Sequence, residues 1–510
     1  MAVAAAVLIP LVYLLVRASD GGAHQFVETL ANRRTLELLG RTVALAAAVT
    51  AAATAIGVVL AWLTTRTDLP GRRVFAVLSA LPLVIPSYVG GYAFIAALGP
   101  KGLAQGWLSP FGVERLPGIY GFFGAWLVLT LFTYPYVLLT VRAAVRRLDP
   151  DLEDAGRSLG RSERDTFRRV VLPQLRPSAT AGALLVALYT IHDFGAVSLM
   201  RFDTFTLAIY TSYQGSFDRS RAAVLGLALV ALTMVLLAAE VRARGRASYY
   251  RTHAGPPRAH RIVRLGRKRW AAFAGCAALV GVALLLPVGV IVYWLVRGGG
   301  GGSDITRTFS AGINSIQASG LAAILAVGAA WPIAVMSVRF PGRTARGLER
   351  VSYIGYALPG IVVALSLVFF GIRAVPALYQ SLVMLVFAYI VLFLPQAGGG
   401  IRASLLQLNP ALEEAAQSLG ARRLATVRRV IVPLVRPGLA AGAALVFLTA
   451  MKELPATLLL APTGFRTLAT EVWSATDAAF FARAAPPALA LVVASSVPLA
   501  VLISREKVAR

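Results

Sequence analysis

The sequence contains few cysteine and charged residues for its length of 510. Its single cysteine, Cys276, lies in an apolar run, which excludes a disulfide framework and a zinc site and is typical of a small buried side chain. Only 14% of the residues are charged, against about 25% in an average soluble protein. A soluble chain of this length would need more polar residues to cover its surface. We therefore expect a membrane protein, with no metal site and no cofactor.

Catalytic groups are scarce as well. There are four histidines, three of them in predicted loops, and none belongs to a recognisable catalytic motif. No GxxxxGK[ST] phosphate-binding loop occurs in the sequence. These absences argue against an enzyme, including a membrane enzyme.

The net charge of +27 would suit a nucleic-acid-binding protein, but the placement of the charge indicates a membrane protein. Lysine and arginine gather in short stretches between apolar runs, and such stretches stay on the cytoplasmic side of a membrane. The most basic stretches are 142–176, 241–270, 339–350 and 401–436. All four fall inside if the N-terminus is cytoplasmic. We therefore expect that orientation in a lipid bilayer, and no nucleic-acid partner.

Apolar runs long enough to span a bilayer, about 20 residues each, recur along the whole chain. The twelve expected spans are 2–17, 41–65, 74–98, 119–141, 179–200, 222–240, 271–296, 316–338, 351–372, 378–398, 437–460 and 485–504. They predict an all-α polytopic membrane protein, with a first domain at 1–240, a basic cytoplasmic linker at 241–270 and a second domain at 271–510. The run Met1–Val16 begins without positive charge, so we expect a membrane helix there rather than a signal peptide.

The two halves share a repeat in their basic loops. Leu148–Leu188 aligns with Leu408–Leu448 without a gap, and 21 of the 41 positions are identical. Shared hydrophobicity cannot explain this match, because most of the stretch is polar. The similarity extends further, since 70–72 and 341–343 both read Pro-Gly-Arg. Such a repeat indicates two copies of one structural unit.

Each copy of the repeat predicts a short cytoplasmic helix. Asp149 or Asn409 can cap its start, and Gly160 or Gly420 suits a left-handed turn at its end. Small and apolar residues at i, i+3, i+4 and i+7 then form one face. In the second copy this face consists of Leu412, Ala415, Ala416 and Leu419. The face can dock into a groove on another protein, although it could also pack on the membrane spans of its own chain.

The repeat resembles the EAA loop of permeases in binding-protein-dependent ATP-binding-cassette importers, which reads Glu-Ala-Ala, three residues, then Gly. The second copy, near 408–437, matches this pattern with Glu414, Ala415, Ala416 and Gly420. The first copy, near 148–177, departs from it conservatively with Asp154, Ala155, Gly156 and Gly160. The resemblance implies the type I importer permease fold, two repeated six-helix halves, and a place in the bacterial inner membrane.

The resemblance also implies partners. Each loop would be a coupling helix that fits a cleft on an ATPase subunit. Because the chain has no phosphate-binding loop of its own, ATP hydrolysis would take place on a separate protein. Two loops in one chain imply two copies of that ATPase, together with an extracytoplasmic substrate-binding protein.

The segments that follow the loops resemble the ferric-iron branch of these fused permeases. They are His192–Tyr210 and Met451–Thr470. The resemblance makes ferric iron the expected substrate. Thiamine, polyamines and oxyanions such as molybdate or sulfate remain alternatives, because other branches of the same class carry them.

Two acidic residues, Asp193 and Glu453, occupy aligned positions near the outer ends of two predicted spans. Acidic groups inside a membrane are costly and often functional, so both are candidates for a polar lining or gate on the path of a cationic substrate. The alternative is an interfacial carboxylate in contact with water. A secondary transporter is a more distant alternative, because such proteins commonly use ionisable residues at the midplane and these spans offer few.

Overall fold

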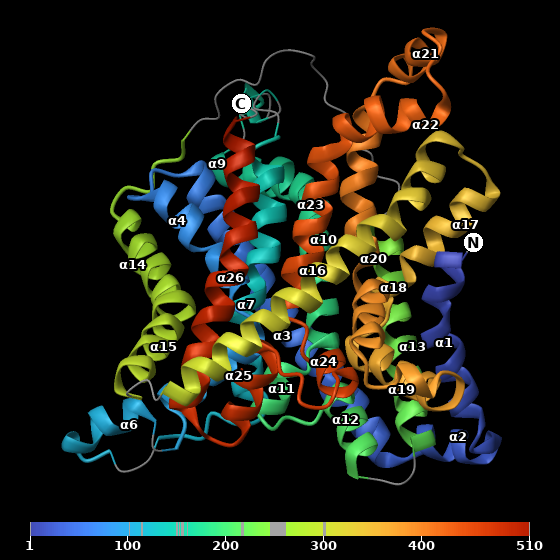
Figure 1. Cartoon of the computed structure of the whole chain (residues 1–510). Helices are drawn as coiled ribbons and strands as arrows, with labels where there is room; N and C mark the ends of the chain where they lie inside the picture. The colour runs from blue at the N-terminus through green and yellow to red at the C-terminus, as the bar shows by residue number, and fades with distance from the viewer. Residues whose placement is uncertain are drawn as a thin grey trace. The chain divides into compact units, whose positions relative to one another are not determined.

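The structure is a computed structural model in which helices form almost all of the regular elements (Figure 1). It describes residues 2–100, 102–113, 116–148, 151, 153–154, 158–160, 162–215, 219–244, 262–298 and 302–508. Within these residues the one exception to helix is an isolated bridge between Thr67 and Val263. The prediction of an all-α fold is confirmed. Most of the predicted linker, 245–261, lies outside the described residues.

Nine helices in the described part of the chain are long and apolar enough to cross a membrane. They are Ala2–Ser19 (α1), Arg33–Arg66 (α3), Phe122–Val145 (α7), Phe167–His192 (η3 and α10), Ser220–Ala239 (within α13, Arg219–Arg244), Lys268–Arg297 (α14, η4 and α15), Ile305–Arg339 (within α16, Gly302–Arg339), Leu382–Gln407 (α20) and Leu424–Met451 (α22, η6 and α23). A bent pair, Arg72–Val84 with Ser87–Phe111, can form a tenth span. Two shorter apolar helices, Gly360–Ala374 (α19) and Phe481–Ser496 (within α26, Phe481–Val508), occupy the remaining predicted positions. The expectation of a polytopic membrane protein in two repeated halves is confirmed, with nine or ten described spans long and apolar enough to cross a membrane and two shorter apolar helices.

Shorter helices connect or interrupt these spans. They are α2 (Gly22–Ala31), α4 (Arg72–Leu78), α5 (Ser87–Leu98), α6 (Leu103–Leu108), α9 (Glu163–Thr166), α11 (Gly195–Leu199), α12 (Phe205–Gly215), α17 (Arg343–Ser352), α18 (Ile354–Ala357), α21 (Ala411–Ser418), α24 (Pro455–Leu460) and α25 (Leu468–Asp477). The predicted bounds 179–200 and 437–460 are wrong at both ends. The helices there start in the cytoplasmic loop and end at His192, directly before Asp193, and at Met451, two residues before Glu453. Helix-forming residues continue the span into the polar loop, which hydropathy alone does not detect.

Contacts divide the chain into two compact units. One unit comprises Met1–Thr35, Ala208–Val230 and Gly298–Arg510, and the other comprises Leu36–Leu207 and Ala231–Arg297. Each unit therefore combines helices from both halves of the sequence. The division of the sequence at 1–240 and 271–510 describes the repeat rather than the packing, and as a domain boundary it stays a prediction.

In the first unit, α1 packs on α19 although more than 300 residues separate them in the sequence. The rings of Tyr13 and Phe370 meet edge to face with centroids 5.0 Å apart. At the outer end, Asp20 accepts hydrogen bonds from Arg17 at 2.8 Å and Arg373 at 3.2 Å. The Arg17 guanidinium, more than that of Arg373, holds the pKa of Asp20 below its ordinary value.

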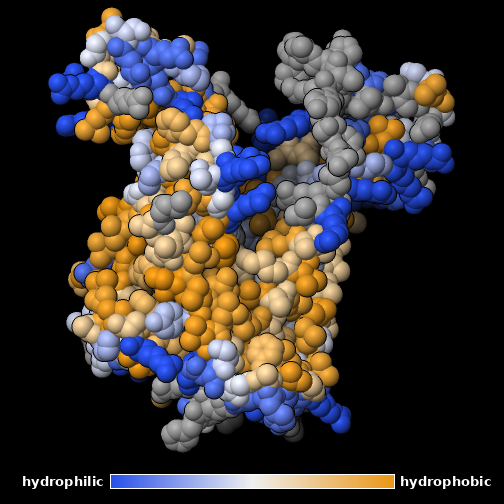
Figure 2. All heavy atoms as spheres, turned by 90° about the vertical axis from the view of Figure 1, so that its right-hand side faces the viewer, coloured by the Kyte–Doolittle hydropathy of each residue, from blue (hydrophilic) through white to orange (hydrophobic). Residues whose placement is uncertain are grey.

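In the second unit, the first span of the second half packs on helices of the first half. The rings of Phe75 in α4 and Phe273 in α14 meet edge to face at 5.4 Å. Cys276 is buried in α14, as expected of a small apolar side chain. On the face that Figure 2 shows, hydrophobic side chains occupy a broad middle band with hydrophilic ones above and below it, as a lipid-facing surface requires.

Candidate functional site

The second cytoplasmic loop contains α21, which has the start and the end that the sequence predicts. The Asn409 side chain accepts a hydrogen bond from the backbone N–H of Ala411 at 3.0 Å, so it satisfies one of the free donors at the helix start. Gly420 has φ +85°, and the N–H of Ala421 donates to the carbonyl of Ala416 at 3.0 Å. A left-handed glycine with this hydrogen bond ends the helix sharply. Local sequence therefore determines both bounds of α21.

The predicted apolar face of α21 is exposed. Leu419 is 87% exposed and Leu412 is 47% exposed, while Ala415 is exposed and Ala416 is half-buried. Figure 1 shows α21 at the far end of its unit, beyond the membrane helices. Glu414, the acidic residue of the motif, is also exposed. A helix with exposed leucines beside small residues presents the kind of surface that another protein covers.

The first loop has the same exposed apolar end, as far as it is described. Leu159 is 79% exposed, and Gly160 has φ +78°. Asp154 is exposed. Ala155 and Gly156 lie outside the described residues. The acidic residue of the motif, the leucine and the glycine are exposed in both copies, whereas Glu153 is buried and Glu413 is half-buried.

An arginine–glutamate ion pair joins each loop to a long membrane helix. Arg66, the last residue of α3, binds both carboxylate oxygens of Glu153, and its contact with Oε2 measures 2.6 Å. Arg339, the last residue of α16, lies 2.6 Å from Oε1 of Glu413. The first pair is buried, with the Arg66 side chain 2% exposed and stacked on the Trp62 ring. Each pair holds its loop against the cytoplasmic end of one spanning helix.

Sequence reasoning missed these two pairs, although a signal for them exists. Glu153 and Glu413 occupy the same position of the repeat, directly before the acidic residue of the motif. Arg66 lies four residues before the shared Pro-Gly-Arg, and Arg339 lies two residues before it. A glutamate at one repeat position and an arginine close to the same tripeptide therefore predict a similar contact in both copies.

A π-helical turn connects each loop to the span that follows it. The two turns are Phe167–Val171 and Val427–Ile431, and they lead into α10 and α23 without a break. Pro173 and Pro433 follow at equivalent places. A proline cannot donate an N–H to the helix and its ring would clash with the carbonyl four residues earlier, which accounts for the wider turn. Each loop therefore leads without a break into the spanning helix that follows it.

Asp193 lies in the break between α10 and α11, where it is buried. Its Oδ1 accepts hydrogen bonds from the backbone N–H of Ala196 at 2.9 Å and of Val197 at 3.3 Å. Its Oδ2 accepts a hydrogen bond from the Ser87 hydroxyl, at the start of α5. The carboxylate thus fixes the bend by capping α11 and binding α5, rather than facing open water.

Glu453 takes the equivalent place between α23 and α24, where it is half-buried. Its Oε1 accepts a hydrogen bond from the N–H of Ala456 at 3.2 Å. The same oxygen lies against Gly360, where an added Cβ would be only 2.5 Å away. The longer acid therefore faces a glycine, and the shorter Asp193 faces Ser87. Both acids act as caps at a bend, and a role in substrate passage stays a prediction.

Both sequence halves match one protein family. Residues 34–242 and 322–504 match the family described as binding-protein-dependent transport system inner membrane component. The Fe(3+)-transport system permease protein FbpB 2 of Haemophilus influenzae is 36% identical over 497 residues, which cover 97% of this chain and 95% of that protein. The probable ABC transporter permease protein y4fN of Sinorhizobium fredii is 27% identical over 466 residues, covering 84% and 80%. The sulfate transport system permease protein CysT of Escherichia coli is 26% identical over 236 residues, covering 45% and 84%.

The two matched segments, the spanning helices of each half and the paired loops agree with one another. The first relative aligns with the chain over nearly its whole length, so the two halves form one fused permease. The matched family is one of inner membrane transport components. Among the described residues, no group of three or more His, Cys, Asp and Glu side chains is placed to hold a metal ion. The chain belongs to the inner membrane components of binding-protein-dependent transport systems, as the fused permease of an ATP-binding-cassette importer.

Proposed function

We propose that the chain moves ferric iron, delivered by an extracytoplasmic binding protein, into the cytoplasm. The observation that carries this proposal is the 36% identity to a ferric-iron permease over 97% of the chain. The sulfate permease matches less than half of the chain at lower identity, which gives an oxyanion substrate weaker support.

We further propose that the two cytoplasmic loops bind two copies of a separate ATPase, with eight residues at the coupling positions. They are Asp154, Ala155, Gly156, Gly160, Glu414, Ala415, Ala416 and Gly420. The exposed face of α21 and the left-handed turns at both glycines support this role. When ATP closes the ATPase dimer, the loops move together and the ion pairs at Arg66 and Arg339 transmit the motion to α3 and α16. Such a cycle requires that ATP and the loaded binding protein bind the inward-open and outward-open states with unequal affinity.

Labelled ferric-iron uptake tests the substrate. Deleting the gene in the native host is expected to abolish uptake through this system, and the wild-type gene is expected to restore it. Excess unlabelled thiamine, spermidine or sulfate should leave the restored uptake unchanged. Uptake that persists after the deletion, in a host with no second iron importer, would overturn the assignment of iron as the substrate. If thiamine, spermidine or sulfate competes, that solute becomes the assigned substrate.

Substitution of Glu453 tests the proposed polar path. Glu453→Gln keeps the size of the side chain and an acceptor for the N–H of Ala456, so the bend should persist. If the charge interacts with a cationic substrate, uptake should fall about tenfold or more while assembly with the ATPase is kept, because one charge contact is worth about 1.5–3 kcal/mol. Asp193→Asn is the matched variant in the first half. Normal uptake in both variants would leave the two acids as helix caps only.

A further inference from the structure

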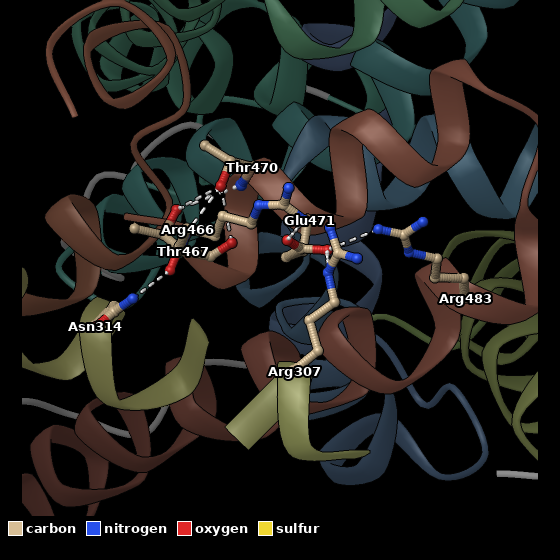
Figure 3. A network of polar contacts seen from close by, with 7 residues as sticks. All are labelled: Arg307, Asn314, Arg466, Thr467, Thr470, Glu471 and Arg483. Atoms are coloured by element: carbon tan, nitrogen blue, oxygen red, sulfur yellow. Dashed lines mark hydrogen bonds and ion pairs between the residues drawn. The ribbon is translucent and has the colours of Figure 1, made fainter. Parts of the chain in front are cut away.

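A buried carboxylate near the outer end of α16 has three arginine neighbours. Glu471, in the first turn of α25, is 3% exposed. Its Oε2 lies 2.9 Å from Nε of Arg307 in α16 and 3.8 Å from a guanidinium nitrogen of Arg483 in α26. Its Oε1 lies 3.2 Å from Arg466, which directly precedes the α25 cap. Figure 3 shows the three arginines converging on Glu471 from three separate segments.

The charges of this cluster do not balance. Arginine stays protonated at any physiological pH, so three positive charges surround a single negative one. One arginine is sufficient to neutralise the carboxylate, and these four side chains together retain two positive charges. Arg466 is the most accessible, with 55% of its side chain exposed. The cluster can therefore attract a further anionic group without losing Glu471.

A pocket lies beside the cluster and gives such a group a place to bind. Its volume is about 490 Å³, and it opens to the surface. The polar residues that line it are Thr306, Arg307, Ser310, Asn314 and Arg466. The Asn314 amide donates to the Arg466 carbonyl at 2.9 Å, and the Thr467 hydroxyl caps α25. These contacts hold the backbone that carries Arg466 at the wall of the pocket.

The pocket lies on the side of the membrane opposite to the coupling loop of the same unit. Arg307 is near the start of α16, and Arg339, which binds the loop at Glu413, is its last residue. At 1.5 Å per residue these positions are about 48 Å apart. That distance exceeds the hydrocarbon core of about 30 Å, so the two ends lie on opposite sides of it. With the loops in the cytoplasm, the pocket faces the exterior.

The first repeat has no counterpart of Glu471 or Arg466 in its sequence. Thr-Leu-Ala occurs at 206–208 and at 467–469, and it aligns Tyr210 with Glu471 and places Phe205 where Arg466 stands. The cytoplasmic loops, in contrast, keep 21 of 41 identities. Two identical ATPase copies require two similar loops, whereas one external protein contacts each half with a different surface. The difference between the repeats therefore fits a single asymmetric partner on the outside.

We propose that this arginine pocket receives a carboxylate side chain of the extracytoplasmic binding protein when that protein docks. This docking proposal rests on the proposed function in one respect, that the chain works with a binding protein as an importer permease. It does not depend on iron being the substrate. A carboxylate suits the site, because guanidinium groups bind it through two parallel hydrogen bonds and the hydroxyls and amide at the wall supply further donors. Docking encloses the ion pair between the two proteins, and charge complementarity also positions the partner and increases its association rate.

The test uses the complete transporter, with its ATPase, in vesicles of neutral lipid, and measures ATPase stimulation against the concentration of the loaded binding protein of the same system. Arg466→Gln is expected to raise the half-maximal concentration about tenfold or more, since losing one partner of a charged contact costs at least about 1.4 kcal/mol. Arg466→Lys keeps the charge but loses the two-point geometry, so it should show a smaller rise. The control is Arg297→Gln, which removes an exposed outer arginine from the end of α15. It should keep the wild-type half-maximal concentration.

An unchanged half-maximal concentration in Arg466→Gln would overturn the proposal. If Arg466→Gln does not assemble, Arg466→Lys decides: a rise supports the docking contact, and a wild-type value overturns it. Sulfate or anionic lipid is also added in the absence of the binding protein. If either changes the ATPase activity of the wild type and not that of Arg466→Gln, the occupant of the pocket is a free anion or a lipid headgroup, and the proposal is overturned. Iron entry is scored in the same vesicles. Stimulation without iron entry would therefore count against the substrate assignment and not against the pocket.

Discussion

Leu419→Asp is expected to abolish stable association with the ATPase and to reduce uptake at least about 100-fold. Leu419 is 87% exposed in the chain alone, so the aspartate costs little in folding. Once an ATPase covers α21, the new carboxylate would be buried without a partner, which costs several kcal/mol. The measurement is co-purification of the ATPase with tagged permease, together with labelled uptake. Leu159→Asp should have the same effect at the first loop.

The matched control for this prediction lies on the same helix. Gln417 is exposed on the opposite face of α21, so Gln417→Asp adds an identical charge about half a turn away from the docking face. It should leave association and uptake close to the wild type. Equal loss in Leu419→Asp and Gln417→Asp would mean that the loop tolerates no added charge and that the apolar face has no special role. Wild-type association in Leu419→Asp would remove the docking role altogether.

Glu153→Ala is expected to destabilise the permease by about 3–5 kcal/mol, because it leaves the buried Arg66 guanidinium without its counter-charge. The unfolding temperature of the purified permease in detergent measures this effect. Glu413→Ala should have a smaller effect, since Arg339 and Glu413 are more exposed than the first pair. An unfolding temperature that does not change in Glu153→Ala would contradict the structural account of the pair.

A double variant separates stability from coupling at the same position. Arg66→Met with Glu153→Leu replaces the ion pair by apolar side chains of similar size, which is often neutral or stabilising. The unfolding temperature should therefore return to the wild-type value or above it. If the pair also transmits motion from the loop to α3, uptake should stay low although the protein is stable. Full uptake in the stable double variant would show that the pair serves folding only.

The structure agrees with most of the predictions that depend only on residues close together in the sequence. Mean hydropathy over some 20 residues locates a span, because each residue in it meets lipid or another helix regardless of which helix that is. The caps and ends of α21 depend on Asn409 and Gly420 themselves, so they could be predicted from single residues. Which residues form the apolar face of the same helix follows from helical periodicity. These features, and with them the family, could be derived before any contact was known.

Tertiary structure decided the features that need two distant segments to meet. Glu153 lies 87 residues from Arg66, and Glu471 lies 164 residues from Arg307. The bends at Asp193 and Glu453 depend on the start of another helix, which supplies a hydroxyl in one case and an open space in the other. The packing of α1 on α19 likewise follows from surface complementarity and not from sequence order. Hydropathy and periodicity describe one segment at a time, so they determined which helices form and which residues make up the apolar face of α21. Only the folded chain determined that this face is exposed, which charges are paired and where surplus charge remains.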